Sequence, residues 1–378
     1  MRRLISGLLL VVFAGCEEDV GPAPRSLELD FLADFNLPPG SRFADEELGG
    51  ISAVVYDAAS ESWLALSDAK RHPRLFTLTT TFEDGELSVE PVELTFLVQK
   101  TGESFGDNVL DPEGLVATPW GTLLVSTEAD LRPEPVEQAK LLEFDRSGRL
   151  VRTFALPQKF VVEGEPPDKG VRHNRGFESL TLAHDGLRLY VGTESPLLQD
   201  GPEASFDRPG FSRIVEYEVS GRELVRSGEY VYPIGPLAPV EGFGDADVFT
   251  GLVELIALSD TRLLALERDY IREKEGDRRS VTRARIFVVD LEDASDVAAL
   301  STLQDGDWRP AQKELLLDLE DIVPELSPGF QSLDNFEAMG LGPALPDGGR
   351  SLLLVSDDNF QDSQRTAFLL FRLKEVES

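Results

Sequence analysis

The chain has 378 residues, of which 41% are hydrophobic, so it is long enough for one large all-β domain or two ordinary domains. Its 69 acidic and 36 basic residues give a formal net charge of -33. Such a charge argues against nucleic acid, or an anionic membrane surface, as a partner held by bulk electrostatics. Cations suit this field better, although surface acidity can also serve solubility alone.

The N-terminus has the pattern of an export signal. Arg2 and Arg3 precede an apolar run at residues 4–13, which is too short to span a bilayer as a helix. We therefore expect residues 1–15 to be a signal peptide and the protein to be exported.

The segment Phe13-Ala14-Gly15-Cys16 resembles a bacterial lipobox, with Phe13 in place of the usual Leu. Cys16 is the only cysteine of the chain, so the mature protein has no internal disulfide, and we predict that Cys16 carries a lipid. An ordinary cleaved signal with an incidental cysteine is the alternative. Residues 16–25 then form an acidic tether to a bacterial membrane, with the outer membrane preferred.

An internal repeat follows, and residues 110–130 are its clearest copy. Each copy begins with Gly-Leu or a similar pair, often after an acid, and continues through an apolar run, a turn, a second apolar run and a polar stop. This pattern predicts a β-hairpin whose two polar ends share one edge, because its strands are antiparallel. Five copies can be aligned, at residues 49–68, 110–130, 177–194, 250–267 and 336–357.

Each hairpin is followed by further strands. A third strand begins with a basic residue in four of the five copies, and a turn then leads to a fourth strand in most of them. Repeated units of four antiparallel strands predict a single all-β propeller over residues 26–378. The count is five blades, and six is the alternative because residues 291–323 are long enough to hold more strands.

The last copy lacks a fourth strand of its own. Residues 26–35 form an unassigned strand ahead of the first copy. Pairing this strand with the C-terminal strand would complete the final blade and close the ring.

Four motifs resemble the phytase-like domain family, also called esterase-like activity of phytase. They begin at Leu48-Gly49-Gly50-Ile51-Ser52, and continue with 111–115 (Asp-Pro-Glu-Gly-Leu), 174–180 (Asn-Arg-Gly-Phe-Glu-Ser-Leu) and 335–339 (Asn-Phe-Glu-Ala-Met). The resemblance covers nearly all of the mature chain and implies a propeller-like extracytoplasmic protein that acts on phosphate esters. Thr250 in the fourth copy and Ser179 in the third depart from the pattern, so a ring of identical groups is not expected.

The polar ends of the five hairpins should converge on one loop-rich face of the propeller. Clustered carboxylates there must be protonated, paired with arginine or bound to a hard cation such as Ca²⁺. Their other interpretation is structural, with each acid tying adjacent blades together. The predicted metal ligands are Glu113, Glu128, Glu194, Glu337 and Asp357, with Asp68 and Glu267 as further members of the set.

Basic residues on the same face could bind phosphate oxygens while water on the metal attacks the ester. The predicted catalytic residues are Glu113, Glu178, Arg175 and His173, the last as proton donor, and the predicted substrate-binding residues are Arg74, Arg213 and Arg268. The predicted function is therefore metal-assisted hydrolysis of a small phosphorylated substrate by a monomer. The alternative is a non-catalytic propeller that binds a ligand, glycan or protein at the cell envelope.

Overall fold

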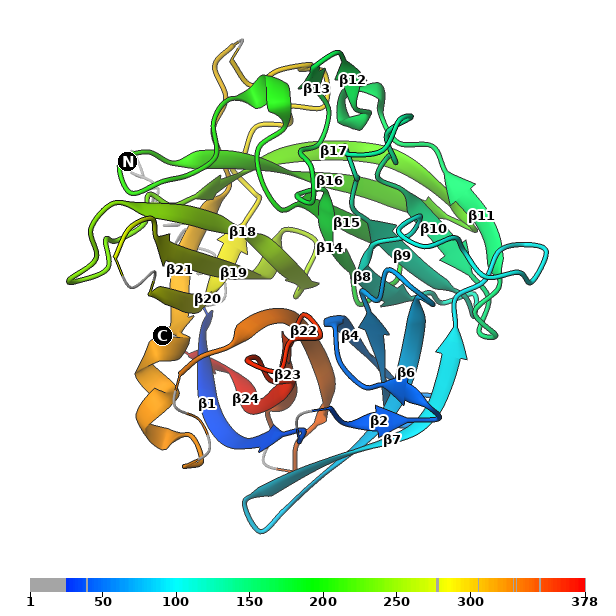
Figure 1. The fold of residues 1–378 in the computed structure, drawn as a ribbon, viewed down its shortest axis with the longest axis vertical. Helices are drawn as coiled ribbons and strands as arrows, with labels where there is room; N and C mark the ends of the chain where they lie inside the picture. The colour runs from blue at the N-terminus through cyan, green and yellow to red at the C-terminus, as the bar shows by residue number, and fades with distance from the viewer. Residues whose placement is uncertain are drawn as a thin grey trace, which may run out of the picture.

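A computed structural model describes residues 25–38, 40–276, 279–304, 306–328, 330, 332–346 and 348–377. The predicted signal peptide and Cys16 lie outside the described residues. Five antiparallel four-stranded sheets surround a common axis (Figure 1). The fold is a five-bladed β-propeller, which confirms the all-β prediction and its blade count.

In each of the first four blades the chain runs from the axis outward, one strand after the next. The first two blades contain β4 (Ile51–Asp57), β5 (Ser62–Ser67), β6 (Arg74–Glu83) and β7 (Glu86–Phe96), then β8 (Pro112–Ala117), β9 (Leu123–Thr127), β10 (Leu141–Phe144) and β11 (Leu150–Phe154). The next two contain β14 (Phe177–Leu182), β15 (Arg188–Thr193), β16 (Gly210–Ser220) and β17 (Glu223–Ile234), then β18 (Ala246–Ala257), β19 (Arg262–Glu273), β20 (Ser280–Asp290) and β21 (Gln312–Asp318).

The fifth blade joins the two ends of the chain. It contains β22 (Asn335–Ala344), β23 (Arg350–Asp357), β24 (Ala367–Glu377) and, as its outer strand, β1 (Arg25–Asn36). The pairing of β1 with β24 runs from Asn36 opposite Ala367 to Arg25 opposite Glu377. The predicted closure of the ring by the N-terminal strand is therefore confirmed.

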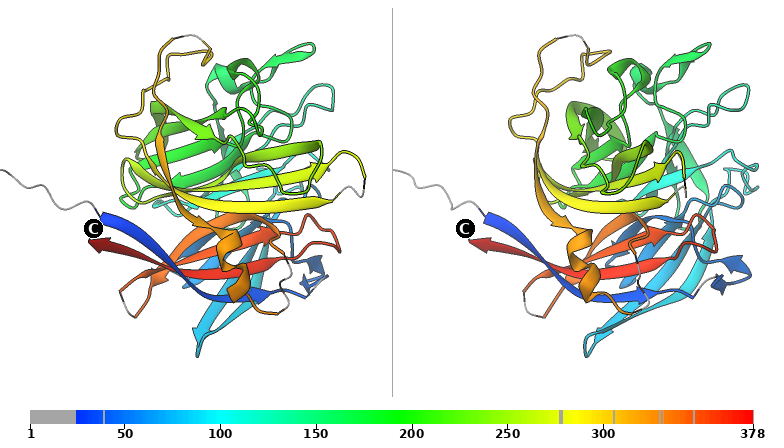
Figure 2. Two further views of the ribbon diagram at one scale, coloured as in Figure 1. Left: turned by 90° about the vertical axis from the view of Figure 1, so that its left-hand side faces the viewer. Right: turned by 60° about the vertical axis from the view of Figure 1, so that its left-hand side comes forward.

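The direction of β1 separates the chain entry from the loop-rich face. Asn36 lies beside the start of β24, on the face where the inner strands begin, whereas Arg25 lies at the opposite face. The free ends of β1 and β24, blue and dark red in Figure 2, project together from that opposite side, away from the end of β19 and the start of β20, which are drawn in yellow. The N-terminal end of β1 therefore lies at the back of the propeller, opposite the face where the inner strands begin.

The hydrophobic cores lie between neighbouring blades. Each of five buried clusters joins residues from two adjacent sheets, and together these clusters run around the ring. Because both faces of a blade are covered, its middle strands have continuous apolar runs, such as 263–266 in β19 and 352–355 in β23, all buried. This packing fixes the tilt of each blade and so the position of every inner-strand end.

Residues 291–323 do not form a sixth blade. They contribute β21 and the 3-10 helix η3 (Leu319–Glu325), while Val297 and Leu303 pack with Val231 of the third blade. Shorter elements lie in the loops between these strands. Two are hairpins, β2 (Arg42–Phe43) with β3 (Glu46–Glu47) and β12 (Glu163–Gly164) with β13 (Pro167–Lys169). Two are 3-10 helices, η1 (Gln158–Phe160) and η2 (Leu198–Asp200). Within the described part of the chain, no helix has the length and apolar character needed to cross a membrane.

Candidate functional site

A cavity of about 700 Å³ opens where the inner strands begin, and we call it the mouth. Hydroxyl and amide groups line its rim, including Ser332, Ser363 and Gln364. Nine carboxylates line it as well: seven are buried, Asp68 is half-buried and Glu320 is exposed. The buried ones are Glu113, Glu128, Glu178, Glu194, Asp334, Glu337 and Asp357. The structure thus brings together all five predicted metal ligands.

The first set of mouth acids sits on β-bulges. The pairing register of every inner strand contains a shift, and the shifts enclose Glu113, Glu178 and Glu337 in three blades. A bulge leaves one residue unpaired and turns its side chain away from the alternation of the sheet. In the first and fourth blades the shifts enclose Ser52 and Val253.

Val253, rather than Thr250, therefore stands in the fourth blade where other blades carry an acid. Thr250 lies three residues earlier and its hydroxyl donates to the Asp269 carboxylate over 2.7 Å. The pair Gly251-Leu252 repeats the Gly-Leu pair that follows Glu113, but the pairing with β19 places the bulge one residue after Leu252, so the sequence match was out of register with the structure.

The second set of mouth residues follows the second strand of each blade. The equivalent positions, defined by their pairing with the inner strands, hold Asp68, Glu128, Glu194, Arg268 and Asp357. Arg268 is thus a basic member of an otherwise acidic ring. Glu267 precedes it by one residue and points away, where it accepts a hydrogen bond from the Tyr232 hydroxyl over 2.9 Å and pairs with Lys313, so Glu267 does not belong to the mouth.

Two arginines partly neutralise the mouth. Nη1 of Arg175 donates to Oε1 of Glu194 over 2.8 Å, and Nη2 of Arg268 donates to Oε1 of Glu337 over 2.6 Å. Oε1 of Glu128 accepts from the backbone N–H of Gly176 over 2.8 Å. Two guanidinium groups facing nine carboxylates leave the lining of the mouth strongly acidic.

Burial and mutual repulsion oppose ionisation of these acids. Burial, followed by the charge of neighbouring acids, raises the pKa of Asp68 and of Glu128 to about 8. The same causes raise the pKa of Glu113, Glu178 and Asp357 well above the ordinary carboxyl range. At neutral pH and without a cation, the mouth therefore holds protons on most of these groups.

The residues of the mouth fit a hard divalent cation. Two groups offer three carboxylate oxygens within 4.8 Å of one another, Asp111 with Glu113 and Glu128, and Glu128 with Glu178 and Glu194. Oε2 of Glu178 and Oδ1 of Asp111 are buried without a hydrogen-bond partner. An all-oxygen set with unsatisfied lone pairs is the environment that Ca²⁺ or Mg²⁺ prefers.

Asp111 was missed as a candidate ligand, although its signal lay in the motif Asp-Pro-Glu-Gly-Leu. Its carboxylate accepts from Nζ of Lys70 over 2.6 Å, and Lys70 also donates to Asn174 over 3.2 Å. Asn174 lines the mouth, so Lys70 links a mouth residue to one of the two carboxylate groups.

His173 lies outside the mouth. Its side chain is 40% exposed, and Nδ1 lies 3.5 Å from Oδ1 of Asp130. The neighbouring Asn174 and Arg175 do line the cavity, so the sequence motif reaches the mouth but the histidine does not.

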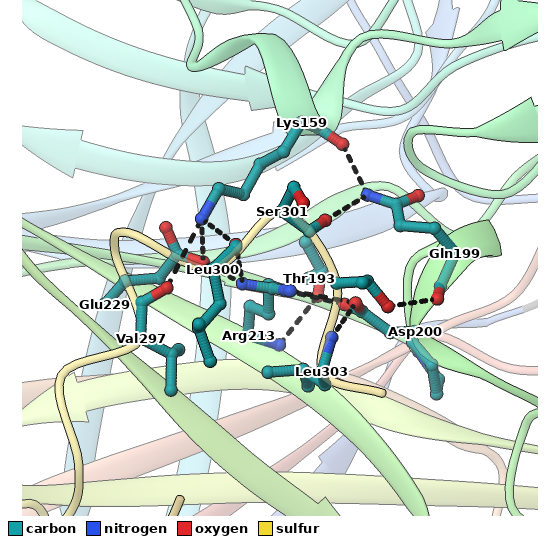
Figure 3. Close-up of polar contacts among 12 residues, drawn as sticks. Lys159, Thr193, Gln199, Asp200, Arg213, Glu229, Val297, Leu300, Ser301 and Leu303 are labelled. Carbon is teal, nitrogen blue, oxygen red and sulfur yellow. Dashed lines mark hydrogen bonds and ion pairs between the residues drawn. The ribbon is translucent and has the colours of Figure 1, made fainter. Parts of the chain in front are cut away.

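The predicted substrate-binding arginines lie in three different environments. Arg268 is in the mouth and Arg74 lines a second cavity, whereas Arg213 lines neither of the two. Arg213 is fully buried, and its guanidinium donates to Asp200 over 2.6 and 2.8 Å and to Glu229 (Figure 3). Each of its three guanidinium nitrogens has a protein partner, which leaves none for a substrate in the mouth.

The network around Arg213 has a structural explanation. Lys159 donates to Oε1 of Glu229 over 3.2 Å and to the backbone oxygen of Leu300 over 2.6 Å, and Asp200 accepts from the backbone N–H of Leu303 over 2.9 Å (Figure 3). These bonds attach the segment after β20 to the third blade. The Arg213 cluster therefore secures an outer loop at a distance from the acidic cavity.

A family model described as "Phytase-like: Esterase-like activity of phytase" matches residues 46–360. An "Uncharacterized secreted protein" from Arthroderma benhamiae is 28% identical over 145 residues. That alignment covers 32% of this chain and 26% of the relative, so the match spans about a quarter of the relative's length.

Two solved structures that align with most of this chain share little sequence with it. The periplasmic gluconolactonase PpgL of Pseudomonas aeruginosa is 12% identical, with 88% of this chain and 86% of that chain covered, at a TM-score of 0.35. A structure described for GH130 mannoside phosphorylases and glycoside hydrolases that target β-1,2 mannosidic linkages in Candida mannan is 11% identical, with 86% and 84% covered, at a TM-score of 0.41.

Proposed function

The chain belongs to the phytase-like family, and on that premise we propose that its mouth binds a divalent cation, with Ca²⁺ as first candidate, and hydrolyses phosphate esters. One observation carries the proposal. Glu128, Glu178 and Glu194 are buried with oxygens within 4.8 Å of one another, and Oε2 of Glu178 has no partner. Such a cluster is costly to ionise without a cation, which explains why a cation should bind there.

The cation would be held by Glu128 together with Glu178 and Glu194, or with Asp111 and Glu113. When bound, it would polarise a phosphoryl oxygen and make water a better nucleophile.

The surrounding side chains have roles of their own. Arg175 and Arg268 face the mouth and can orient a phosphate through guanidinium nitrogens not used by Glu194 or Glu337. Glu113, whose pKa is raised by burial, can hold the proton that a leaving alkoxide needs.

A non-catalytic binding protein is the second candidate. It is favoured by the ion pairs of Arg175 with Glu194 and of Arg268 with Glu337, since arginines already neutralised by wall acids attract phosphate less strongly. A cation could then serve only to hold the five blades together at their axis. The two candidates differ in turnover rather than in cation binding.

The test combines two measurements on the same protein. Thermal unfolding with and without Ca²⁺ reports cation binding, and phosphate release from para-nitrophenyl phosphate reports hydrolysis. Glu178→Gln should lower both responses, whereas Glu314→Gln, a change at an exposed residue of β21, should lower neither. Cation binding without phosphate release would refute the hydrolase and leave the binding protein.

We also propose that the protein is exported and held at a membrane through Cys16. The relative described as secreted supports export. Arg25 lies nine positions after Cys16, a reach of about 30 Å at full extension, whereas β1 spans about 36 Å from the back of the propeller toward the mouth. An anchored propeller would therefore present its mouth to the aqueous compartment, and a soluble phosphate ester would be a better substrate than a phospholipid headgroup.

Energy transfer to labelled lipid vesicles tests this orientation. A dye at Ser363→Cys marks the mouth, and a dye at Ser220→Cys marks the back of the third blade. The lipidated protein should transfer more energy from position 220 than from position 363, and Cys16→Ser should abolish transfer from both. Equal or reversed transfer would refute the orientation whether or not the protein hydrolyses phosphate esters.

A further inference from the structure

The basic residue that opens the third strand differs in its partners from blade to blade. Lys140 donates to Oε2 of Glu137 over 3.0 Å. Arg213 donates to Asp200 and Glu229, and Arg285 donates to Asp269 over 2.8 and 3.0 Å. In these three blades a carboxylate is hydrogen-bonded to the basic group.

Arg74 of the first blade has no such partner. It is 3% exposed, and its guanidinium donates to the backbone oxygens of Glu47 over 2.9 Å and His72 over 3.3 Å. Nε has no hydrogen-bond partner, and the nearest carboxylate, Glu46, lies 3.6 Å from Nη1. A buried guanidinium without a hydrogen-bonded anion is unusual, because desolvation of the charge is normally offset by close pairing.

Arg74 lines a cavity of about 920 Å³ that we call the side pocket. The side pocket is separate from the mouth but shares Asp68 and Asn359 with it. Its volume lies in the range of small-molecule sites. The Phe360 ring, which is 36% exposed, lies 5.6 Å from the Arg74 guanidinium and provides an apolar wall.

Left-handed backbone gathers around the side pocket. Nine non-glycine residues of the described chain have positive φ, and five of them line this cavity: Asp45, His72, Asn108, Asn359 and Phe360. Asp, His and Asn tolerate this conformation, whereas a bulky residue such as Phe rarely adopts it. Phe360 is therefore the backbone outlier of the set, and such outliers tend to persist at ligand sites.

We propose that the side pocket binds a small organic monoanion whose carboxylate or phosphate group is received by Arg74. The carbon skeleton of the ligand would lie against Phe360. This site is distinct from the mouth, and it does not depend on the hydrolase function proposed above.

The charge of the side pocket limits the ligand to one negative group. Four basic residues, Arg42, Lys70, Arg71 and Arg74, face five acids in its lining. The lining is thus close to charge balance in a chain of charge -33. Arg42 and Arg71 are exposed and Lys70 donates to Asp111, so Arg74 is the basic residue of this lining that is buried without a hydrogen-bonded carboxylate.

Fluorine NMR of fluorobenzoate, titrated with the full-length protein in EDTA, measures binding at this site without a cation in the mouth. Arg74→Gln should weaken binding by about tenfold or more, since a charge-assisted hydrogen bond is lost. Phe360→Ala should weaken it as well. Lys140→Gln, at the equivalent position of the second blade, is the matched control and should bind as the wild type does.

Competition then distinguishes the anionic group. Displacement of fluorobenzoate by inorganic phosphate at lower concentration than by acetate would indicate a phosphate ligand, and the reverse order would indicate a carboxylate ligand.

Because Arg74 also donates to the backbone oxygen of Glu47, Arg74→Gln could impair folding, and Phe360→Ala then tests the site independently. Absence of binding at tens of millimolar, or binding lost in Arg268→Gln and retained in Arg74→Gln and Phe360→Ala, would overturn the proposal.

Discussion

Replacement of Glu128 by glutamine should stabilise the cation-free protein and remove its response to cations. Glu128 belongs to both carboxylate groups of the mouth. Burial and the charges of Glu194 and Asp111 raise its pKa from 4.5 to about 8. Glutamine keeps the shape of the side chain and an oxygen that can accept from the Gly176 N–H, which Glu128 does over 2.8 Å.

The direction in which stability changes with pH follows from proton binding. Because the pKa is raised in the folded state, the folded protein holds a proton on Glu128 that the unfolded chain has lost, so stability falls as pH rises from about 4.5 to about 8. A shift of that size corresponds to at most about 5 kcal/mol above pH 8, and to less than about 1 kcal/mol near pH 5. Coupling to neighbouring acids makes the first figure an upper bound. Glu128→Gln should therefore match the wild type at pH 5 and exceed it at pH 9.

Urea unfolding in EDTA at pH 5, 7 and 9 measures this difference. Glu143→Gln is the matched control, because it should lower the stability of the protein where Glu128→Gln raises it. Burial alone would raise the pKa of Glu143, but hydrogen bonds from Thr122, Trp120 and Arg152 lower it, so loss of its charge should destabilise the protein at neutral pH. A Glu128→Gln protein that is less stable than the wild type at pH 9 without cations would refute the conclusion that the charged form of Glu128 destabilises the folded protein.

Three further outcomes follow from the same geometry. Calcium affinity should rise with pH through about 8, and calcium binding should release protons, because burial and neighbouring acids raise the pKa of Asp68 and of Glu128 to about 8. Calorimetry in two buffers of different ionisation enthalpy measures the affinity and the number of protons released. Arg213→Met should cost about 3–5 kcal/mol in urea unfolding, since Asp200 and Glu229 stay buried with less compensation, yet the folded variant should keep its calcium response. Gly251→Ala should fold but bind calcium more weakly, because its Cβ would lie 2.3 Å from Cγ of Glu194 and displace that side chain; unchanged affinity would contradict a role for Glu194.

The propeller could be predicted because the sequence pattern that specifies each blade is local and is repeated along the chain. Each blade shows the same order of apolar runs and turns, and an unassigned strand at one end matched a missing strand at the other. The convergence of hairpin ends on one face follows from antiparallel pairing alone. Glu113, Glu128 and Glu178 could therefore be assigned to the mouth without coordinates.

The side-chain directions could not be predicted with the same certainty. In a strand a shift of one residue turns a side chain to the opposite face, so Glu267 and Arg268 exchange roles if the register is misjudged by one. The inner-strand bulges introduce that kind of shift, and no residue type marks them in the sequence. Arg74 and Arg213 occupy equivalent positions, yet their surroundings depend on which loop covers them.

The cost of the acidic mouth explains where the stability of this fold must come from. Buried carboxylates with raised pKa values oppose folding at neutral pH, while the apolar clusters between blades favour it around the whole ring. Closure by β1 completes those clusters, because Phe31 packs on Phe371 at the seam where the two chain ends meet. A propeller closed in this way can keep Glu178 buried with an unpaired oxygen, and that unpaired oxygen is the feature on which the proposed cation site at the axis rests.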